Sequence, residues 1–287
     1  MNSLTQEQIT QFQQDGYLVV RSVISAQTLK NLRHAADEIV VESRHVTQSD
    51  DNFTLEPDHT SDRLRLRQVR HPVVHRPIFW NVATSNEVLD CVEGLIGPNI
   101  KFHHSKLNMK VERGGTEIGW HQDVAFFPYT NFDLVACGLA LDDTTVENGC
   151  LLVVPGSHRI GMLNHRDETG EFVGKITVKS GGFDSDEAVP VELKAGDMSI
   201  HHVAVAHCSL ANQSSRSRRV AVFQYAACDA IPLDHRPPEN EFSQKVVRGT
   251  PATHARLAGA MVLPLRGDTG GARSLFDLNL PKTGRVV

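Results

Sequence analysis

The sequence predicts a mainly β protein, a jelly-roll barrel with N-terminal helices packed on one of its sheets. Two observations lead to this fold class. From about residue 100 onward, short runs of alternating apolar and polar residues are separated by turn residues, which is typical of many short strands. The first hundred residues instead show helical periodicity with capping residues. Helices ahead of a run of strands fit a barrel with helices covering one sheet.

The N-terminal elements are predicted from their caps. A capping box that begins at Thr5 predicts a first helix to about Gln14, and residues 17–20 (Tyr-Leu-Val-Val) predict a strand after it. Ser25 is a typical N-cap, and apolar residues on one face predict a second helix over 26–43.

The remaining elements follow from periodicity and turn residues. Residues 44–62 are polar and acidic and predict a mobile loop, whereas 77–96 predict a helix. Asn148-Gly149 is a type I′ hairpin signal between two apolar runs. The expected strands are 100–111, 134–142, 151–154, 190–194, 198–204 and 219–226, with a further strand at His121; the 198–204 strand leads towards His207.

Composition limits the function classes. Of 287 residues, 40% are hydrophobic and 22% charged, as expected for a soluble globular protein. A formal net charge of −5 argues against nucleic-acid binding, and the apolar runs are too short to span a membrane. The five cysteines form an odd set without a CxxC motif and predict buried or neutral thiols in a reducing compartment rather than a disulfide framework. With no signal peptide visible, we expect a cytoplasmic protein with a small-molecule substrate and leave its oligomeric state open.

The pair His121-x-Asp123 and the distant His207 match the two-histidine, one-carboxylate set that holds non-haem Fe(II). On an extended strand, residues i and i+2 point to the same side. Both side chains can therefore reach one ion, and a third ligand from a neighbouring strand completes one face of its coordination. The alternative is a hydrogen-bonded pair in a barrel wall.

The segment after His207 suggests a second ligand. A polar turn follows the histidine, and Arg218 opens the next apolar strand. A metal could chelate one end of a keto acid while an arginine binds the carboxylate at the other end through a two-pronged, charge-assisted contact. Strand alternation places the rival Arg219 on the opposite face, and Arg216 falls in the turn.

An ordered series of motifs resembles the phytanoyl-CoA dioxygenase family of Fe(II)/2-oxoglutarate oxygenases over about residues 4–230. The series is His121-x-Asp123, Glu147-Asn148-Gly149-Cys150-Leu151, Pro155-Gly156-Ser157-His158 and His207-x-Ser209-x-x-Asn212-x-Ser214-x-x-x-Arg218. The resemblance implies a double-stranded β-helix with a cupin-like barrel that holds iron at one mouth. It also implies Fe(II) as cofactor, with 2-oxoglutarate and O2 as co-substrates.

The resemblance also implies roles for single residues. The metal ligands would be His121, Asp123 and His207. Arg218 and the Ser209 hydroxyl would bind the C5 carboxylate of 2-oxoglutarate, and Asn108 resembles an amide that contacts 2-oxoglutarate in some relatives. Lys106 and Lys110 share the face of Asn108 and are further candidates.

The expected organisation is one oxygenase domain over 1–287. It consists of N-terminal helices and a loop (1–99), a jelly-roll core (100–230) and a C-terminal extension (231–287). The expected reaction hydroxylates an unactivated C–H bond of a small organic metabolite, with succinate and CO2 as co-products.

The same iron could instead support desaturation, epoxidation or cyclisation. A halogenase would need the carboxylate ligand replaced by a small residue, and Asp123 argues against it. A Zn-dependent hydrolase and a non-catalytic cupin-like binding protein are candidates from different classes, and each could use the same three ligands.

Several further residues could act in a site or serve the fold. Phe126, Phe127 and Tyr129 could line a substrate pocket or pack in the core. A basic cluster, Arg63, Arg65, Arg67 and Arg70, could meet an anionic substrate or form a solvated strand face. His201 and His202 are expected in the barrel wall or behind the ligands, and His158 in the turn above the barrel.

Overall fold

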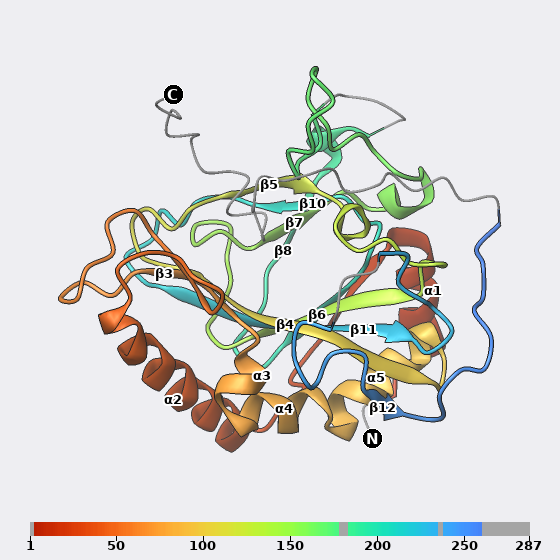
Figure 1. The fold of residues 1–287 in the computed structure, drawn as a ribbon, viewed down its shortest axis with the longest axis horizontal. Coiled ribbons are helices and arrows are strands. Elements are labelled where there is room, and N and C mark those ends of the chain that lie inside the picture. Colours follow the sequence, from red (N-terminus) through yellow and green to blue (C-terminus); the bar gives the residue numbers. More distant parts are fainter. Residues whose placement is uncertain (1–2, 178–182, 235–237, 260–287) are drawn as a thin grey trace.

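The computed structural model describes residues 3–177, 183–234 and 238–259. In it, two antiparallel sheets face each other across the interior (Figure 1). The larger sheet has the order β1-β9-β6-β11-β4-β3-β2, with β12 also paired to β4, and the smaller has the order β5-β10-β7-β8. The strands of the larger sheet are β1 (Tyr17–Val20), β2 (Phe53–Leu55), β3 (Leu66–Arg70), β4 (Ile100–Lys110), β6 (Leu134–Ala140), β9 (Met198–His202), β11 (Arg218–Ala227) and β12 (Val246–Arg248). Those of the smaller sheet are β5 (Ile118–His121), β7 (Leu151–Val153), β8 (Val189–Val191) and β10 (His207–Ser209).

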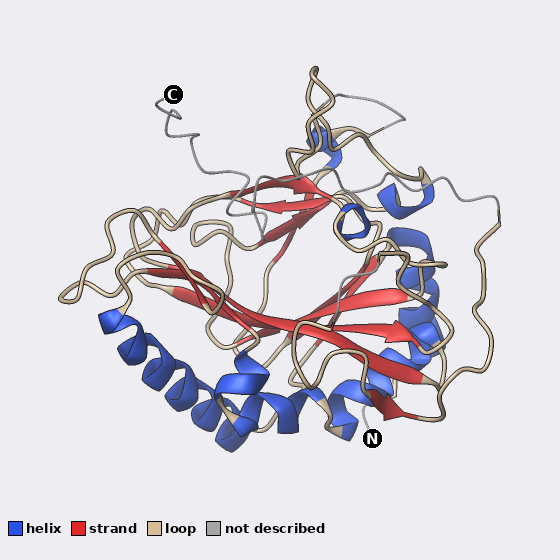
Figure 2. Ribbon diagram, viewed as in Figure 1, coloured by secondary structure: helices blue, strands red, loops and turns tan. Residues whose placement is uncertain are grey.

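Helices cover the outer face of the larger sheet, which leaves its inner face toward the smaller sheet (Figure 2). The helices are α1 (Gln6–Asp15), α2 (Ala26–Glu42), α3 (Pro72–His75), α4 (Pro77–Ala83) and α5 (Asn86–Ile96). The described residues also form the 3-10 turns η1 (Ser43–His45), η2 (Asp123–Ala125), η3 (Ser157–Arg159) and η4 (Ser185–Glu187). The predicted jelly roll with N-terminal helices on one sheet is confirmed.

Strand alternation separates the core from the interior cavity. On β11, Phe223 and Tyr225 face the helices and are fully buried, and the Tyr225 hydroxyl donates to Ala83 O at 2.7 Å. Between them, Gln224 points to the opposite side and lines the cavity. One face of the strand therefore anchors it to α4, and the other is free to carry polar side chains.

The predicted caps are present. Thr5 and Gln8 form the capping box of α1, and Gly16 ends the helix in the left-handed region with φ 78°. The Ser25 hydroxyl accepts from Thr28 N at the start of α2. Local sequence is sufficient to place these helix ends because a cap is formed by residues three positions apart.

The predicted mobile loop at 44–62 is wrong in part, because it contains β2, which pairs with β3. Glu56, just after β2, is buried and bonds to Arg67 Nε at 2.8 Å. The strand is a short buried run, Phe53-Thr54-Leu55, within an otherwise polar segment, and this run is too short to stand out in the sequence.

The predicted helix over 77–96 is two helices, since α4 ends at Ala83 and α5 begins at Asn86. Thr84 bonds its hydroxyl to Trp80 O at 2.9 Å, and Ser85 adopts an extended conformation as the next N-cap. Hydroxyl side chains that compete for backbone partners favour such a break.

The type I′ hairpin expected at Asn148-Gly149 is not formed. The flanking strands β6 and β7 lie in different sheets, and of the two residues only Gly149 has positive φ, at 77°. Instead, the Asn148 side chain accepts from Thr145 N at 2.8 Å and closes a wider turn that connects the sheets.

Candidate active site

A cavity of about 1020 Å³ opens between the two sheets. Its floor consists of the inward side chains of β4 and β11, which are paired in register. The opposed pairs are Lys110 with Arg218, Asn108 with Val220, Lys106 with Val222 and His104 with Gln224. This size suits small organic ligands.

The three predicted metal ligands converge at this cavity. β10 pairs with β5 so that His207 lies opposite His121, and Asp123 follows at the start of η2. One possible ligand atom from each of the three residues lies within 4.8 Å of the others. Gln122 between them is extended and points away, with its amide donating to Gly161 O and Ala204 O.

The chemistry of these donors fits Fe(II). The Nδ1 atoms of His121 and His207 lie 2.8 and 3.0 Å from backbone carbonyl oxygens, so each ring donates from Nδ1 and leaves the Nε2 lone pair for a metal. Burial lowers the pKa of both histidines, which keeps them neutral. Burial alone would raise the pKa of Asp123, but the contact with His201 holds it well below its usual range. Two neutral imidazoles and one carboxylate form the set that binds non-haem Fe(II).

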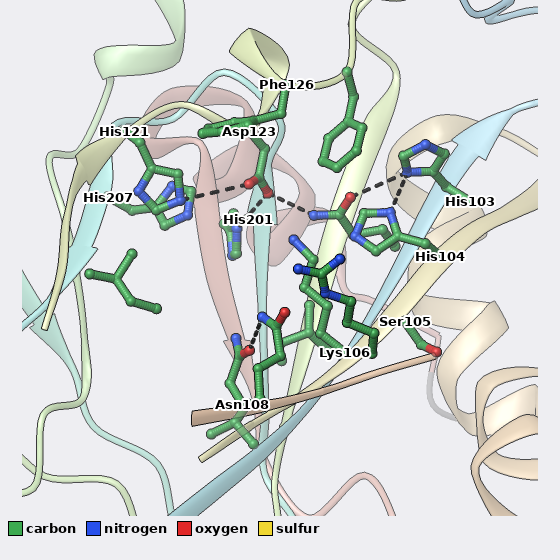
Figure 3. Close-up of a pocket in the computed structure, with 18 of the residues that line it drawn as sticks. His103, His104, Ser105, Lys106, Asn108, His121, Asp123, Phe126, His201 and His207 are labelled. Atoms are coloured by element: carbon green, nitrogen blue, oxygen red, sulfur yellow. Dashed lines mark hydrogen bonds and ion pairs between the residues drawn. The ribbon is translucent and has the colours of Figure 1, made fainter. Parts of the chain in front are cut away.

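A second group of side chains surrounds the ligand carboxylate (Figure 3). Gln224 Nε2 donates to Asp123 Oδ2 at 2.8 Å, and His201 Nε2 lies 3.5 Å from the same oxygen. His103 Nδ1 is 3.4 Å from Gln224 Oε1 and 2.7 Å from His104 Nδ1. A chain of polar contacts therefore runs from the ligand into β4.

Sequence reasoning missed Gln224, His103 and His104. In a regular strand, adjacent histidines point to opposite faces. A bulge shifts the β11–β4 register between Gln224 and Tyr225, so both rings contact Phe127 at the cavity. Burial lowers the pKa of His103 to about 3 and that of His104 well below its ordinary value. A bulge has no reliable local signal, so only the pair itself could have suggested a site.

The comparisons with known proteins agree with this geometry. The family model described as "Phytanoyl-CoA dioxygenase (PhyH)" matches residues 12–220. The chain belongs to this family. It is therefore an Fe(II)- and 2-oxoglutarate-dependent dioxygenase, with His121, Asp123 and His207 as the residues that would hold the iron.

Individual relatives support the family and the fold. The chain is 30% identical to a "Probable alpha-ketoglutarate-dependent hypophosphite dioxygenase" of Stutzerimonas stutzeri over 88% of each chain. It is 25% identical to the human peroxisomal phytanoyl-CoA dioxygenase (86% of this chain, 76% of the relative) and to a "Methylphosphonate hydroxylase" of Gimesia maris (78% and 82%). The iron-bound structure of EctD from S. alaskensis shares the fold, with a TM-score of 0.68 at 20% identity over 87% of this chain and 88% of that one. The zinc hydrolase and the non-catalytic binding protein are thereby set aside.

The arginines on and before β11 lie where alternation predicts. Arg218 is buried, lines the cavity and donates from Nη2 to Gly149 O. Arg219 points outward, where its Nε donates to Asp142 at 2.8 Å, and Arg216 lies in the turn before the strand. Burial lowers the pKa of Arg218 to about 10, which leaves it charged at neutral pH.

Ser209 and Asn108 also line the cavity. Ser209 ends β10, two residues after the ligand His207. Asn108 Oδ1 accepts from Gln68 Nε2 at 2.8 Å, so the oxygen of the Asn108 amide is the atom that Gln68 binds. The two candidate 2-oxoglutarate contacts therefore face the same space as the triad.

The aromatic candidates line the cavity as well. Phe127 packs against the His103 ring at 4.7 Å between centroids, and Lys106 Nζ lies 5.5 Å from the Phe127 centroid. Phe126 lies near the ligand His121, with centroids 6.1 Å apart, and Tyr129 is the third aromatic of the wall.

The basic cluster does not act as one face. Arg65 and Arg67 are neither solvated nor in the cavity, because both are buried in ion pairs, Arg65 with Asp58 and Glu112 and Arg67 with Glu56. Arg63 is exposed. Arg70, at the end of β3, is the member that lines the cavity.

The remaining histidines have structural positions. His158 Nε2 lies 3.2 Å from Gln13 O, and its ring packs 5.1 Å from that of His202. Both thus join α1 to η3 outside the cavity, as expected for His158.

All five cysteines are buried and free, and burial raises the pKa of each thiol, so the prediction of neutral thiols is confirmed. Over the described ranges, no helix combines the length and apolar character needed to cross a membrane.

Proposed function

We propose that this dioxygenase hydroxylates a C–H bond of a small anionic metabolite, with phosphonates as the leading substrate class. The observation that carries the proposal is a pair of cations in the cavity wall. Arg70 on β3 lies directly opposite Lys106 on β4, and both line the cavity that contains the triad.

The environment of Lys106 favours an anion nearby. Burial and the charge of Arg70 both lower its pKa, while Asp123 and Glu239 raise it. A bound oxyanion beside Lys106 would supply a further counter-charge for its buried ammonium. Phe127, whose ring centroid lies 5.5 Å from Lys106 Nζ, offers an apolar surface for the rest of a small substrate.

Two relatives point to the same class of anion. Their names denote a hypophosphite dioxygenase and a methylphosphonate hydroxylase, and both of these substrates are compact phosphorus oxyanions. The family name points to a larger anion, an acyl-CoA thioester, as the alternative. Charge alone does not separate the two, so the substrate screen must contain both.

For the co-substrate, we propose that Arg218 and the Ser209 hydroxyl bind the C5 carboxylate of 2-oxoglutarate and that Asn108 contacts it through its amide. The buried guanidinium is suited to a carboxylate because its fork matches the two oxygens. Bound iron supplies the activation of O2. The balance is one 2-oxoglutarate, one O2 and one C–H bond giving succinate, CO2 and an alcohol, with one oxygen atom in succinate and one in the alcohol.

The protein's own residues would orient the reactants. Arg70 and Lys106 would fix the anionic end of the substrate, so that a C–H bond faces the metal. Phe126 beside His121 would exclude water from that space. Desaturation, epoxidation and cyclisation are the alternative outcomes of the same chemistry, and they differ in product mass.

The test is a turnover screen with methylphosphonate, hypophosphite, a longer phosphonate and phytanoyl-CoA. Succinate formation above the substrate-free rate identifies the substrate, and a product heavier by one oxygen identifies hydroxylation. Lys106→Met should raise the KM of the active anion about 30-fold, as expected for a lost charge partner. The exposed Lys194→Met serves as control. Turnover of phytanoyl-CoA alone, or a KM that Lys106→Met leaves unchanged, would overturn the substrate class. Turnover of hypophosphite alone would place the oxidation at a P–H bond and overturn the C–H hydroxylation.

A further inference from the structure

We propose that Lys110 is a second cation for the C5 carboxylate of 2-oxoglutarate, paired with Arg218, and that it takes up a proton when the dicarboxylate binds. The inference rests on the proposed role of Arg218 and extends it. The family motifs quoted above do not contain Lys110.

The two residues lie directly opposite each other. Lys110 is the last residue of β4 and Arg218 the first of β11, and they are partners in the β4–β11 register. Both side chains line the cavity, and they are only 3% and 6% exposed. Two buried positive charges side by side are unfavourable, so their retention at a cavity wall points to an anion that binds between them.

The described residues supply no carboxylate dedicated to this pair. Lys110 Nζ donates to two backbone carbonyls, Thr116 O at 2.7 Å and Ser209 O at 3.3 Å. Glu56, the acid that raises the pKa of Lys110 most, already accepts from Arg67 Nε and the Thr116 hydroxyl, each at 2.8 Å.

On the arginine side, Asp142 is bonded to the outward Arg219 at 2.8 Å. Arg218 Nε has no hydrogen-bond partner within the described ranges of the chain. One donor of the buried guanidinium is thus unsatisfied.

Gly149 contacts both Lys110 and Arg218. Its carbonyl oxygen accepts from Arg218 Nη2. With φ 77°, a Cβ on this residue would lie 2.8 Å from Lys110 Cδ and 2.3 Å from Leu210 O. The absence of a side chain at Gly149 therefore leaves room for the aliphatic part of Lys110, while the Gly149 carbonyl binds Arg218.

The turn after β10 also contacts the Lys110 end of β4. Asn212 is fully buried, and its Nδ2 donates to Lys110 O at 3.0 Å and Arg216 O at 2.8 Å. Gly149 thus contacts both Lys110 and Arg218, while Asn212 holds the backbone of Lys110; both are members of the family motifs.

The protonation of Lys110 follows from its neighbours. Burial, and then the charge of Arg218, lower its pKa to about 7, while Glu56, Cys208 and Glu117 act in the opposite direction. Burial raises the pKa of the Cys208 thiol and of the Cys150 thiol beside Arg218, so both thiols are neutral. Above pH 7 the ligand-free lysine is therefore mostly neutral. A bound carboxylate favours the charged form, which requires a proton from solvent.

The first test compares two keto acids in the anaerobic Fe(II) protein by titration of the visible charge-transfer band. 2-Oxoglutarate carries the C5 carboxylate, and 2-oxopentanoate has a methyl group in its place. Lys110→Met should raise the Kd of 2-oxoglutarate about 30-fold and leave that of 2-oxopentanoate unchanged. Lys110→Arg, which keeps the charge, should restore much of the affinity. Unchanged 2-oxopentanoate binding also shows that the variant is folded.

The second test measures proton uptake by calorimetry at pH 8 in buffers of different ionisation enthalpy. Wild-type protein should take up most of a proton with 2-oxoglutarate and none with 2-oxopentanoate, and Lys110→Met should take up none with either. If Lys110 had only a structural role, Lys110→Met would weaken the binding of both keto acids equally and leave the proton uptake of the wild type unchanged. That result would overturn the inference.

The Arg218→Met variant separates the two proposals. If it does not weaken 2-oxoglutarate relative to 2-oxopentanoate, the proposed anchor itself fails. If Arg218→Met weakens 2-oxoglutarate binding selectively and Lys110→Met does not, the proposed role of Arg218 holds and only the proposed role of Lys110 is wrong.

Discussion

At the residue scale, the metal site depends on which nitrogen of each histidine is free. Backbone carbonyls two residues upstream fix Nδ1 of His121 and His207, so the ligand atoms are oriented before iron binds. Removing either ligand type leaves too few donors for tight binding of a divalent metal. His121→Ala and Asp123→Ala should each abolish stoichiometric Fe(II) binding and the band that 2-oxoglutarate produces anaerobically. Retention of that band in Asp123→Ala would show that another carboxylate serves as ligand.

Gln224 is expected to hold the ligand carboxylate in place, since it donates to Asp123 Oδ2 and leaves the other oxygen for the metal. Residues behind metal ligands typically contribute 10–100-fold in affinity. Gln224→Leu should therefore weaken Fe(II) binding by about 10–100-fold, measured by competition with a chelator. Gln68→Leu is the matched control, because Gln68 lines the same cavity but bonds to Asn108. Equal affinities for Gln224→Leu and wild type would refute the positioning role.

At the scale of single elements, the turn between β6 and β7 sets the geometry of the co-substrate end. Gly149→Ala adds the cost of a non-glycine residue at positive φ, about 1–3 kcal/mol, and a clash with Leu210 O and the Lys110 stem. We expect the free energy of unfolding to fall by at least about 2 kcal/mol and 2-oxoglutarate to bind more weakly.

Gly170 provides the control for this turn. It has a similar φ of 83°, but a Cβ there would meet no atom of the described residues within 4 Å. Gly170→Ala should cost only the backbone strain and leave 2-oxoglutarate binding intact. Equal destabilisation by both alanines, measured in urea, would show that the contact with Lys110 is unimportant.

At the scale of the whole molecule, one main sheet links the N-terminal helices, the barrel and the described part of the C-terminal segment. β12, from the predicted 231–287 extension, pairs with β4, while residues 260–287 lie outside the described ranges. We propose that the chain folds as the single oxygenase domain expected from the sequence.

Buried neutral histidines should make the iron-free protein sensitive to acid. Burial lowers the pKa of His103 and His202 to about 3 and that of His165 to about 4, below the unfolded value of about 6.5. Between these limits the unfolded state binds more protons, so stability falls as pH falls below about 6.5. Each histidine contributes up to about 1.4 kcal/mol per pH unit.

Urea unfolding at pH 7, 6 and 5 measures this dependence. His202→Gln removes one of these groups without touching the metal ligands, so its slope between pH 6 and 5 should be smaller than that of the wild type by about one proton. Stability that is constant from pH 7 to 5 would contradict the neutral state of these rings.

The sequence by itself determined the features that depend on near neighbours or on ordered motifs. The capping box at Thr5, the alternation that separates Arg218 from Arg219, and the triad from His121 to His207 are all of this kind. A cap joins residues three apart, alternation has a fixed period of two, and the family motifs occur in a fixed order.

Only the tertiary structure decided which polar residues share the cavity. A register shift turns His103 and His104 to one side, and burial in ion pairs removes Arg65 and Arg67 from the surface while Arg70 reaches the cavity. The pairing of β4 with β11 brings Lys110 beside Arg218, 108 positions away in the sequence. Strand pairing and burial depend on contacts between distant segments, and no local pattern encodes them.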